Sequence, residues 1–317
     1  MKKYLYILSL VLWIACDSSE KHTVTPPVLK GKIVFSKPIV SNPYLKALVI
    51  KQLDGDSEQY ISDPAGDSYS PPWNPNWSPD AKKVVYVYDA FEGPFKRVIY
   101  IDSKADLPLG YDPANEPLWS PAGDKILSSF QYFNFQIIDS TPGFSSYVIC
   151  FDGPDSLEWN SQTVFLKKGH ARWNTEEEIF LLATPQRYEY SKSDSLLEIY
   201  RYDYVTKTLV ERMTNNLLDE KNFEISLDHQ RIVFTQDTGS SKVTYLMNTA
   251  DTVATPIIHG KHETVKWFGK THYLYYVRFP NPTVYFMDTD HPDKEYELMP
   301  VYNEHIDIWA EPDSAGE

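Results

Sequence analysis

Short apolar segments alternate with polar, turn-forming segments throughout residues 31–313 of this chain. Residues 77–86 are the clearest example, because a tryptophan is followed by a Ser-Pro-Asp turn and then by an apolar run. Residues 119–127 have the same order of features. The apolar runs are rich in β-branched and aromatic residues and end at Asp, Gly, Pro or Asn, which is typical of strands and turns. No convincing helical spacing of apolar residues interrupts them, so the pattern predicts an all-β protein.

This unit recurs along the chain. Degenerate copies follow the two clear ones, at residues 173–181, 225–234, 267–275 and 309–313, and the second of these has isoleucine in place of tryptophan. Successive copies begin about 40–55 residues apart, a period typical of repeats that bury apolar surface only against each other. A second apolar segment ending in Asp or Asn follows each anchor, at residues 98–102, 147–152, 199–203, 245–248 and 284–288. Four strands per unit indicate β-propeller blades, and a sandwich with tryptophan in its core is the alternative.

The two ends of this region complement each other. Residues 31–36 resemble the strand that follows the turn, but no tryptophan precedes them. Residues 306–313 supply a tryptophan and a turn with no strand after them. Five complete units and this composite unit predict a six-bladed β-propeller of four-stranded antiparallel blades, closed by pairing of the N- and C-terminal segments. Such closure leaves no open sheet edge.

The repeat resembles that of the TolB-type, WD40-like β-propeller proteins, in which a Trp-Ser-Pro-Asp-Gly-Lys core precedes an Ile-Tyr-x-x-Asp strand. The match is specific at residues 77–102, good at 119–152 and weak elsewhere, although the periodicity covers 31–313. The resemblance implies the propeller fold. TolB-type proteins also carry an α/β domain before the propeller, whereas only a short tether precedes the first strand here. The family's partners therefore do not follow from the resemblance.

The first 30 residues are expected to lie outside the propeller. Residues 1–15 combine a basic start with a short apolar run, which predicts a signal peptide. The next residue, Cys16, predicts a bacterial lipoprotein with a lipid anchor on this cysteine, and an ordinary secretory signal is the alternative. Residues 16–30 then form the lipidated cysteine and a flexible tether, and residues 31–317 a single propeller domain. Since Cys150 is the only other cysteine, no internal disulfide is expected.

The sequence is acidic, with 44 Asp and Glu against 30 Lys and Arg and a formal net charge of −14. A surface of this sign repels phosphate backbones and anionic headgroups, so nucleic acid is not expected as a partner. Membrane attachment is expected through the lipid anchor, on the periplasmic or outer side of a bacterial envelope. The expected partner is a protein or a polysaccharide of the cell envelope, and the protein itself is expected to be a monomer.

Two groups of loop residues are candidates for partner binding. Inserted aromatic segments in the third and fourth units are expected to form a rim on one face, and such side chains are common at recognition surfaces. Packing of these rings onto the propeller is the alternative. Loops that lead into the innermost strands are expected to place histidines at the mouth of the central channel. The candidates are Tyr132, Phe133, Phe144, Arg187, Tyr188 and Tyr190 for the aromatic rim, and His170, His262 and His305 for the channel mouth.

The sequence contains no catalytic motif of the Gly-x-Ser-x-Gly, His-Glu-x-x-His or phosphate-loop type. No metal or cofactor is predicted, because isolated loop histidines are more often solvated than metal-bound. The sequence thus predicts a lipid-anchored, noncatalytic binding or scaffold module for an envelope protein or an extracellular polymer. The alternative is a polysaccharide lyase or glycoside hydrolase with its site at the channel mouth, where the histidines would supply the chemistry.

Overall fold

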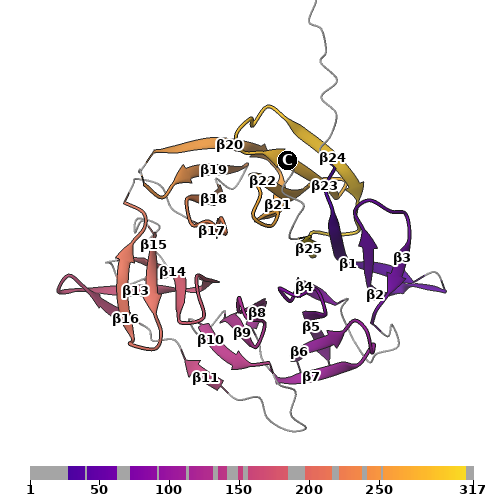
Figure 1. Cartoon of the computed structure of the whole chain (residues 1–317), viewed down its shortest axis with the longest axis horizontal. Coiled ribbons are helices and arrows are strands. Elements are labelled where there is room, and N and C mark those ends of the chain that lie inside the picture. The colour runs from indigo at the N-terminus through magenta and orange to yellow at the C-terminus, as the bar shows by residue number, and fades with distance from the viewer. Residues whose placement is uncertain are drawn as a thin grey trace, which may run out of the picture.

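A computed structural model describes residues 28–311, apart from 40, 63–71, 91–92, 112–113, 131–134, 141–148, 153–155, 185–196, 216–220, 238–240 and 251–252. All secondary-structure elements in the described residues are β-strands. These residues contain no helix that is long and apolar enough to cross a membrane. The strands form six sheets around a central axis (Figure 1). The predicted six-bladed β-propeller is confirmed.

Each sheet is one blade, and in blades 1, 2, 3, 5 and 6 the strands are given in order from the channel outwards. Blade 1 contains β25 (Ile306–Ala310), β1 (Gly31–Ile39), β2 (Asn42–Gln52) and β3 (Glu58–Tyr60). Blade 2 contains β4 (Trp73–Trp77), β5 (Lys83–Ala90), β6 (Gly93–Tyr100) and β7 (Asp106–Tyr111). Blade 3 contains β8 (Ala114–Trp119), β9 (Lys125–Phe130), β10 (Phe135–Asp139) and β11 (Ile149–Asp152). Blade 4 contains β12 (Ser156–Trp159), β13 (Gln162–Trp173), β14 (Glu178–Thr184), β15 (Glu198–Asp203) and β16 (Thr208–Arg212). Blades 5 and 6 contain β17 (Lys221–Ile225), β18 (Arg231–Asp237), β19 (Lys242–Asn248) and β20 (Ala254–Gly260); and β21 (His262–Trp267), β22 (Tyr273–Arg278), β23 (Thr283–Asp288) and β24 (Glu295–Pro300).

Tryptophan anchors fill the gaps between neighbouring blades, as the repeat predicts. Trp77 ends β4 and packs in one buried cluster with Val34 and Leu48 of blade 1 and with Val84 and Tyr86 of its own blade. A flat ring of this size suits the wedge between two twisted sheets. The anchors that take the equivalent place between later blades are Trp119, Trp173 and Trp267.

A serine holds the tight turn after the anchor. The Ser78 hydroxyl donates to Asp80 at 2.7 Å and accepts the Lys83 backbone N–H at 2.9 Å. The same arrangement follows the isoleucine anchor of blade 5, where Ser226 donates to Asp228 at 2.6 Å. These bonds satisfy polar groups that the turn would leave unpaired. The turn therefore survives in blade 5, where the tryptophan is replaced.

The two ends of the described chain meet in blade 1. Strand β1 pairs antiparallel with β25, in a register that runs from Gly31 opposite Ala310 to Phe35 opposite Ile306 (Figure 1). A Cβ atom at position 31 would collide with the backbone carbonyl of Trp309, so glycine is required by this close approach. The predicted closure by the terminal segments is confirmed.

Two details of the predicted blades are wrong. In blade 3, residues 147–152 were expected as the partner of the strand after the turn, but β10 pairs with β9 and β11 is the outer strand. The segment 135–139 has the same apolar character and also ends in Asp, so it competes equally well for this place. Residues 131–134 therefore lie between the second and third strands of blade 3, and residues 141–148 lie between the third and fourth, so Tyr132 and Phe133 belong to a different connection from Phe144. Blade 4 carries a fifth strand, β12, which pairs with the first part of β13.

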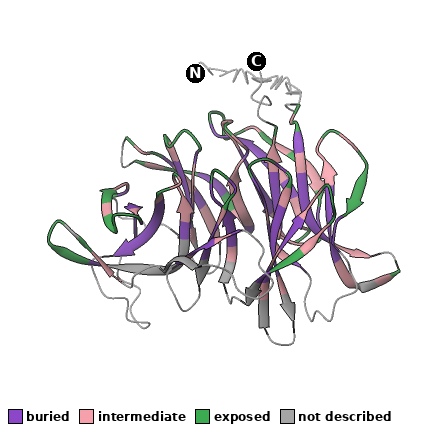
Figure 2. Cartoon of the chain, turned by 60° about the horizontal axis from the view of Figure 1, so that its bottom comes forward, coloured by how far each residue is buried: buried purple, intermediate pink, exposed green. Residues whose placement is uncertain are grey.

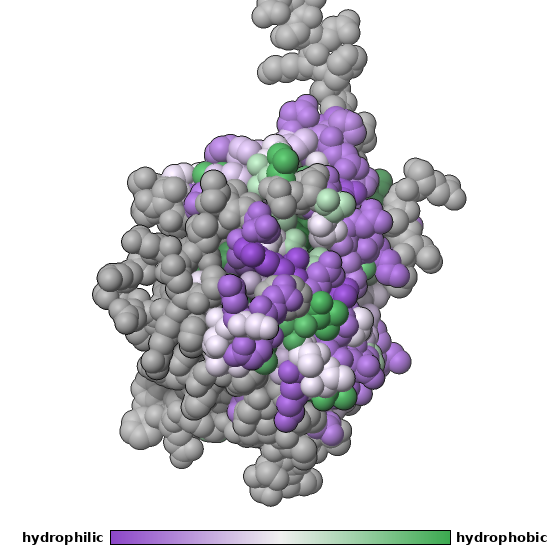
Figure 3. Space-filling model, turned by 90° about the vertical axis from the view of Figure 1, so that its left-hand side faces the viewer, coloured by the Kyte–Doolittle hydropathy of each residue, from purple (hydrophilic) through white to green (hydrophobic). Residues whose placement is uncertain are grey.

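Burial is greatest in the middle strands of the blades and lowest in the outermost strands (Figure 2). Strand β25 begins with three buried residues, whereas the outermost strands β16 and β24 are mostly exposed or half-buried. Hydrophilic residues predominate among the described residues visible on the blade 4 side (Figure 3). Large exposed hydrophobic side chains are scattered over several blades, which is ordinary for a protein surface. The most exposed are Val28, Val205, Leu227, Val253 and Tyr302.

Candidate binding site at the channel mouth

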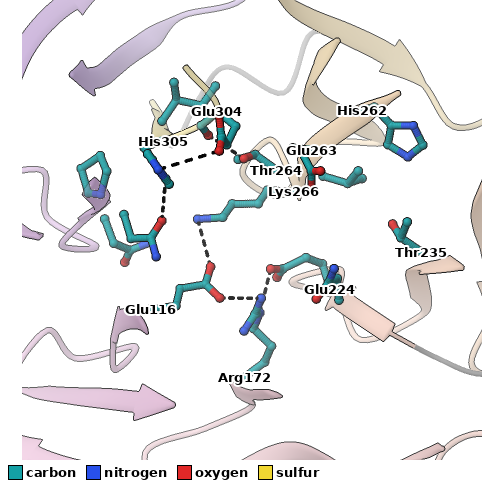
Figure 4. Close-up of a pocket in the computed structure, with 16 residues that line it drawn as sticks. Glu116, Arg172, Glu224, Thr235, His262, Glu263, Thr264, Lys266, Glu304 and His305 are labelled. Carbon is teal, nitrogen blue, oxygen red and sulfur yellow. Dashed lines mark hydrogen bonds and ion pairs between the residues drawn. The ribbon is translucent and has the colours of Figure 1, made fainter. Parts of the chain in front are cut away.

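A cavity of about 190 Å³ lies in the channel, at the end where the innermost strands begin (Figure 4). All six blades contribute to its wall, so the cavity depends on closure of the ring. Each blade contributes at least one residue to the wall. Examples are Asn74 of blade 2, Glu116 of blade 3, Arg172 of blade 4, Glu224 of blade 5, Lys266 of blade 6 and Ile306 of blade 1.

The backbone of three innermost strands is distorted at the cavity wall. Asn74, Asn222 and Thr264 each lie three residues before their blade's anchor and have positive φ angles of 47°, 47° and 54°. The strand register shifts at the same places. A β-branched residue rarely adopts this conformation, and the Thr264 hydroxyl compensates by donating to the Glu304 carbonyl at 2.6 Å. Three of the nine described non-glycine residues with positive φ therefore lie at the cavity, and backbone strain of this kind is common at functional sites.

Arg172 on β13 stands between two carboxylates in the channel (Figure 4). Its Nε donates to Glu224 at 2.7 Å, and its Nη2 lies 3.0 Å from Glu116. Burial alone would lower the pKa of Arg172, but the two glutamates raise it above its ordinary value, so the guanidinium stays charged. Burial raises the pKa of Glu224, although Arg172 acts in the opposite direction. These contacts join blades 3, 4 and 5.

Lys266 on β21 extends the same network across the channel. Its Nζ lies 3.8 Å from Glu116 of the opposite blade and 3.4 Å from Asp307 of blade 1. Asp307 also accepts the Trp77 backbone N–H and the Tyr275 hydroxyl, each at 2.8 Å. Burial lowers the pKa of Lys266, but Asp307 and Glu116 raise it to a net value above the ordinary one. The channel charge network consists of Glu116, Arg172, Glu224, Lys266 and Asp307, and with Trp77 it joins all six blades.

Two of the predicted histidines lie in the cavity wall and are held by hydrogen bonds. His262 is 1% exposed, with Nδ1 3.0 Å from the Gly260 carbonyl and Nε2 2.7 Å from the Thr244 hydroxyl. Because a carbonyl only accepts, Nδ1 carries the proton and Nε2 accepts from the threonine. Burial lowers the pKa of His262 to about 4, so the ring is neutral at pH 7. His305 lies 2.9 Å from Asn74 through Nδ1, and burial lowers its pKa as well.

The remaining predicted residues are not brought to this wall by the described structure. His170 belongs to β13, but its side chain lies outside the described residues. Cys16 and the aromatic rim candidates also lie outside them, and these candidates are Tyr132, Phe133, Phe144, Arg187, Tyr188 and Tyr190. The aromatic rim and the lipid anchor therefore stay predictions.

Sequence reasoning missed the channel charge network. Its members stand one to three residues before the anchors, on the innermost strands of the blades. A charge directly before a buried tryptophan, as in Arg172 before Trp173 or Lys266 before Trp267, is the signal that was present. Since the innermost strands of a propeller line a channel, such charges are expected to point inwards and to find partners there.

The chemistry of the wall suits binding better than proton transfer. Glu116 and Glu224 are both bonded to Arg172, and both nitrogens of His262 are hydrogen-bonded. Among the described residues, no three His, Cys, Asp or Glu side chains come together at the cavity in a way that could hold a metal ion. A group of three that could do so lies at the other end of blade 6. The wall instead contains many hydrogen-bonding groups in fixed positions, around a cavity that is large enough for one side chain of a partner and ordered water.

Comparisons with known proteins identify the fold. No protein-family model and no curated protein sequence matches the chain. Among solved structures, TolB from Acinetobacter baumannii is similar, with 18% identity and a TM-score of 0.61 over 87% of this chain and 65% of that one. A putative TolB from Agrobacterium tumefaciens has 12% identity and a TM-score of 0.55, over 89% of this chain and 97% of that one. An oligogalacturonate lyase in complex with manganese has 12% identity and a TM-score of 0.52, over 87% and 75%.

These structures share the propeller architecture at identities that show the fold alone. The chain spans slightly less than two thirds of the Acinetobacter TolB chain. The predicted resemblance to TolB-type propellers is thus confirmed at the level of the fold. The similar structures include an oligogalacturonate lyase as well as TolB proteins, so the fold alone does not decide the function.

Proposed function

We propose that this protein is a noncatalytic binding module of the bacterial cell envelope, and that it receives part of a partner protein at the channel mouth. One observation carries the proposal. The cavity wall is built from all six blades, and its charged groups are bonded to one another rather than poised for reaction. A preformed polar hollow of this kind binds a side chain with little reorganisation.

The location rests on two further observations. Residues 1–15 have the pattern of a signal peptide, and Cys16 follows it directly. The similarity to two TolB structures supports an envelope location and a binding or scaffold role. A lipid on Cys16 would hold the propeller at a membrane, and residues 16–30 would let the body turn towards its partner. Labelling with a radioactive fatty acid, compared between the natural chain and Cys16→Ala, tests the anchor.

Blocking the cavity tests the binding role. Glu304 stands at the cavity wall with a side chain 39% exposed, so Glu304→Trp places a large ring over the opening without removing a core contact. The matched control is Glu211→Trp on the outer strand β16, where the side chain is 51% exposed. Partner recovery from solubilised envelopes of the source bacterium is expected to fall at least tenfold for the first variant and to stay unchanged for the second. Equal recovery by both variants would remove the cavity from the proposal.

The predicted aromatic rim needs its own variant, because it is a separate surface. Replacement of Tyr132, Phe133, Tyr188 and Tyr190 by alanine tests it in the same recovery assay. If this variant, whose cavity is not blocked, recovers less partner than the natural chain, the partner binds at the rim. Unchanged recovery, together with loss in the cavity-blocked protein, would assign it to the channel mouth.

A second candidate function is cleavage of an acidic polysaccharide, and the similarity to a manganese-bound oligogalacturonate lyase favours it. The purified protein would be incubated with oligogalacturonates and manganese, and the unsaturated product followed by ultraviolet absorbance. Turnover that disappears in His305→Ala, whose side chain is half-buried at the cavity, would replace the binding proposal. Absence of turnover in the natural chain supports the noncatalytic reading.

A further inference from the structure

Three side chains of residue types that bind metal ions lie close together where β22 begins and β23 ends. His272 directly precedes β22, Asp288 ends β23, and Asp290 follows two residues later. One ligand atom from each lies within 4.8 Å of the ligand atoms of the other two. The other end of β22 pairs with His262 at the channel cavity. The three side chains therefore form a second site, at the opposite end of blade 6 from the cavity.

The backbone holds these residues in place. The backbone N–H and the hydroxyl of Thr289 both donate to the His272 carbonyl, at 3.0 Å and 2.6 Å. The Asp288 carboxylate is 8% exposed, and its Oδ1 accepts the backbone N–H groups of Asp290 at 2.9 Å and His291 at 3.2 Å. Ligands fixed in this way by surrounding hydrogen bonds lose little freedom when an ion binds.

The spacing of His272 and Asp288 fits a bridging ion better than a direct hydrogen bond. His272 Nε2 lies 3.6 Å from Asp288 Oδ1, which is too long for a hydrogen bond. Zinc binds imidazole nitrogen and carboxylate oxygen at about 2.0–2.2 Å, so two tetrahedral ligands of one ion lie about 3.4 Å apart. A mixed set of imidazole and carboxylates is typical of zinc and its neighbours in the first transition row, and less so of calcium or magnesium.

The neighbouring blade orients the third ligand and leaves access from solvent. Arg231 of blade 5 lies 2.9 Å from Asp290 Oδ1 and donates to the Thr289 hydroxyl at 2.6 Å. This contact occupies one oxygen of Asp290 and leaves the second for an ion. A cavity of about 180 Å³ opens beside His272 and is also lined by Arg231 and Lys270. Three protein ligands and an open cavity leave a coordination position for water or an anion.

We propose that His272, Asp288 and Asp290 form a binding site for a divalent transition-metal ion of the zinc type, separate from the channel. The ion binds between the imidazole and the two carboxylates, of which Asp290 also faces Arg231 and Asp288 faces His291 Nδ1 at 3.0 Å. The cavity lined by Arg231 and Lys270 admits water or an anion as the exchangeable ligand of the ion. Arg231 acts as a positioning residue, because it contacts Asp290 and not the ion.

Cobalt(II) titration of the purified, chelator-treated full chain tests the site, since tetrahedral cobalt absorbs visible light strongly. One equivalent is expected to bind, to be displaced by zinc and to raise the melting temperature. His272→Ala and Asp290→Asn are each expected to weaken zinc binding at least tenfold in calorimetry. Both side chains are 40% or more exposed, so these variants are expected to fold.

The matched controls are His259→Ala and Asp56→Asn, which remove an exposed histidine on β20 and a fully exposed aspartate of blade 1. Both controls are expected to bind zinc as the natural chain does. Cobalt spectra like those of the hydrated ion, or equal zinc affinity in the site variants and the controls, would overturn the proposal.

Discussion

Replacement of Asp307 by alanine is expected to loosen the propeller at its closure point. Asp307 lies on β25 and its side chain is 9% exposed. It accepts the Trp77 backbone N–H of blade 2 and the Tyr275 hydroxyl of blade 6, each at 2.8 Å. It also lies 3.4 Å from Lys266. Alanine leaves the N–H and the hydroxyl buried in the closed ring without this acceptor, and it leaves Lys266 with Glu116 as its remaining ion-pair partner.

The size of the effect follows from the desolvation of those donors. Removing one partner of a buried ion pair costs about 3–5 kcal/mol, mostly because the remaining charge is left uncompensated. The unpaired N–H and hydroxyl act in the same direction. For a domain of this size, 1 kcal/mol corresponds to about 2 °C in melting temperature. Asp307→Ala is therefore expected to melt roughly 6–10 °C below the natural chain. Asp307→Asn keeps one acceptor oxygen and is expected to lose about half as much.

Urea unfolding and differential scanning calorimetry measure this loss, with Asp56→Ala as the matched control. The Asp56 side chain is fully exposed, so its variant is expected to stay within about 0.5 kcal/mol of the natural chain. A double-mutant cycle with Lys266→Met is expected to show coupling above 1 kcal/mol, because the two residues are partners. Melting of Asp307→Ala within 2 °C of the control, or additive effects in the cycle, would refute the role of the network.

Three further outcomes follow from the closure and from the buried histidine. Gly31→Ala is expected to cost about 1–3 kcal/mol by collision with the facing backbone carbonyl, whereas Gly55→Ala meets only ordinary contacts and serves as its control; equal urea midpoints would contradict this. Deletion of 303–317 exposes the edge of β1 and is expected to cause aggregation in light scattering, which a monomer with unchanged melting would disprove. The pKa of His262 is lowered from 6.5 to about 4 in the folded chain, so the stability it gives is full above pH 6.5 and is lost as the pH falls towards 4. Between pH 6.5 and pH 4, the free energy of unfolding of His262→Gln is expected to fall by about 3 kcal/mol less than that of the natural chain. Urea unfolding at several pH values measures this difference, and parallel stability curves for the two proteins would contradict it.

The architecture could be predicted because it depends on local signals that repeat. The anchor and the Ser-Pro-Asp turn mark each blade, and the incomplete units at the two ends predict the pairing of β1 with β25. Blade 3 was misassigned because two apolar segments ending in Asp, 135–139 and 147–152, follow one anchor there. Local pattern does not decide between such segments; the contacts with β9 do.

The functional chemistry could be predicted less well, because it depends on contacts between distant positions. Glu116 and Lys266 meet across the channel from opposite blades, although 150 residues separate them in the sequence. His272 and Asp288 come together through the pairing of β22 with β23, and no short motif marks them. A repeat predicts where each strand lies, but the partners of a charge depend on which blade stands opposite.

The channel charge network has a consequence for how a partner can bind. Arg172 and Lys266 are each shared by two carboxylates, so an anion entering the cavity must compete with groups already fixed there. A neutral or cationic group of the partner meets no such competition and finds acceptors in the wall. Partner binding at this site is therefore expected to weaken little with salt unless the partner brings a positive charge, in which case affinity falls as ionic strength rises.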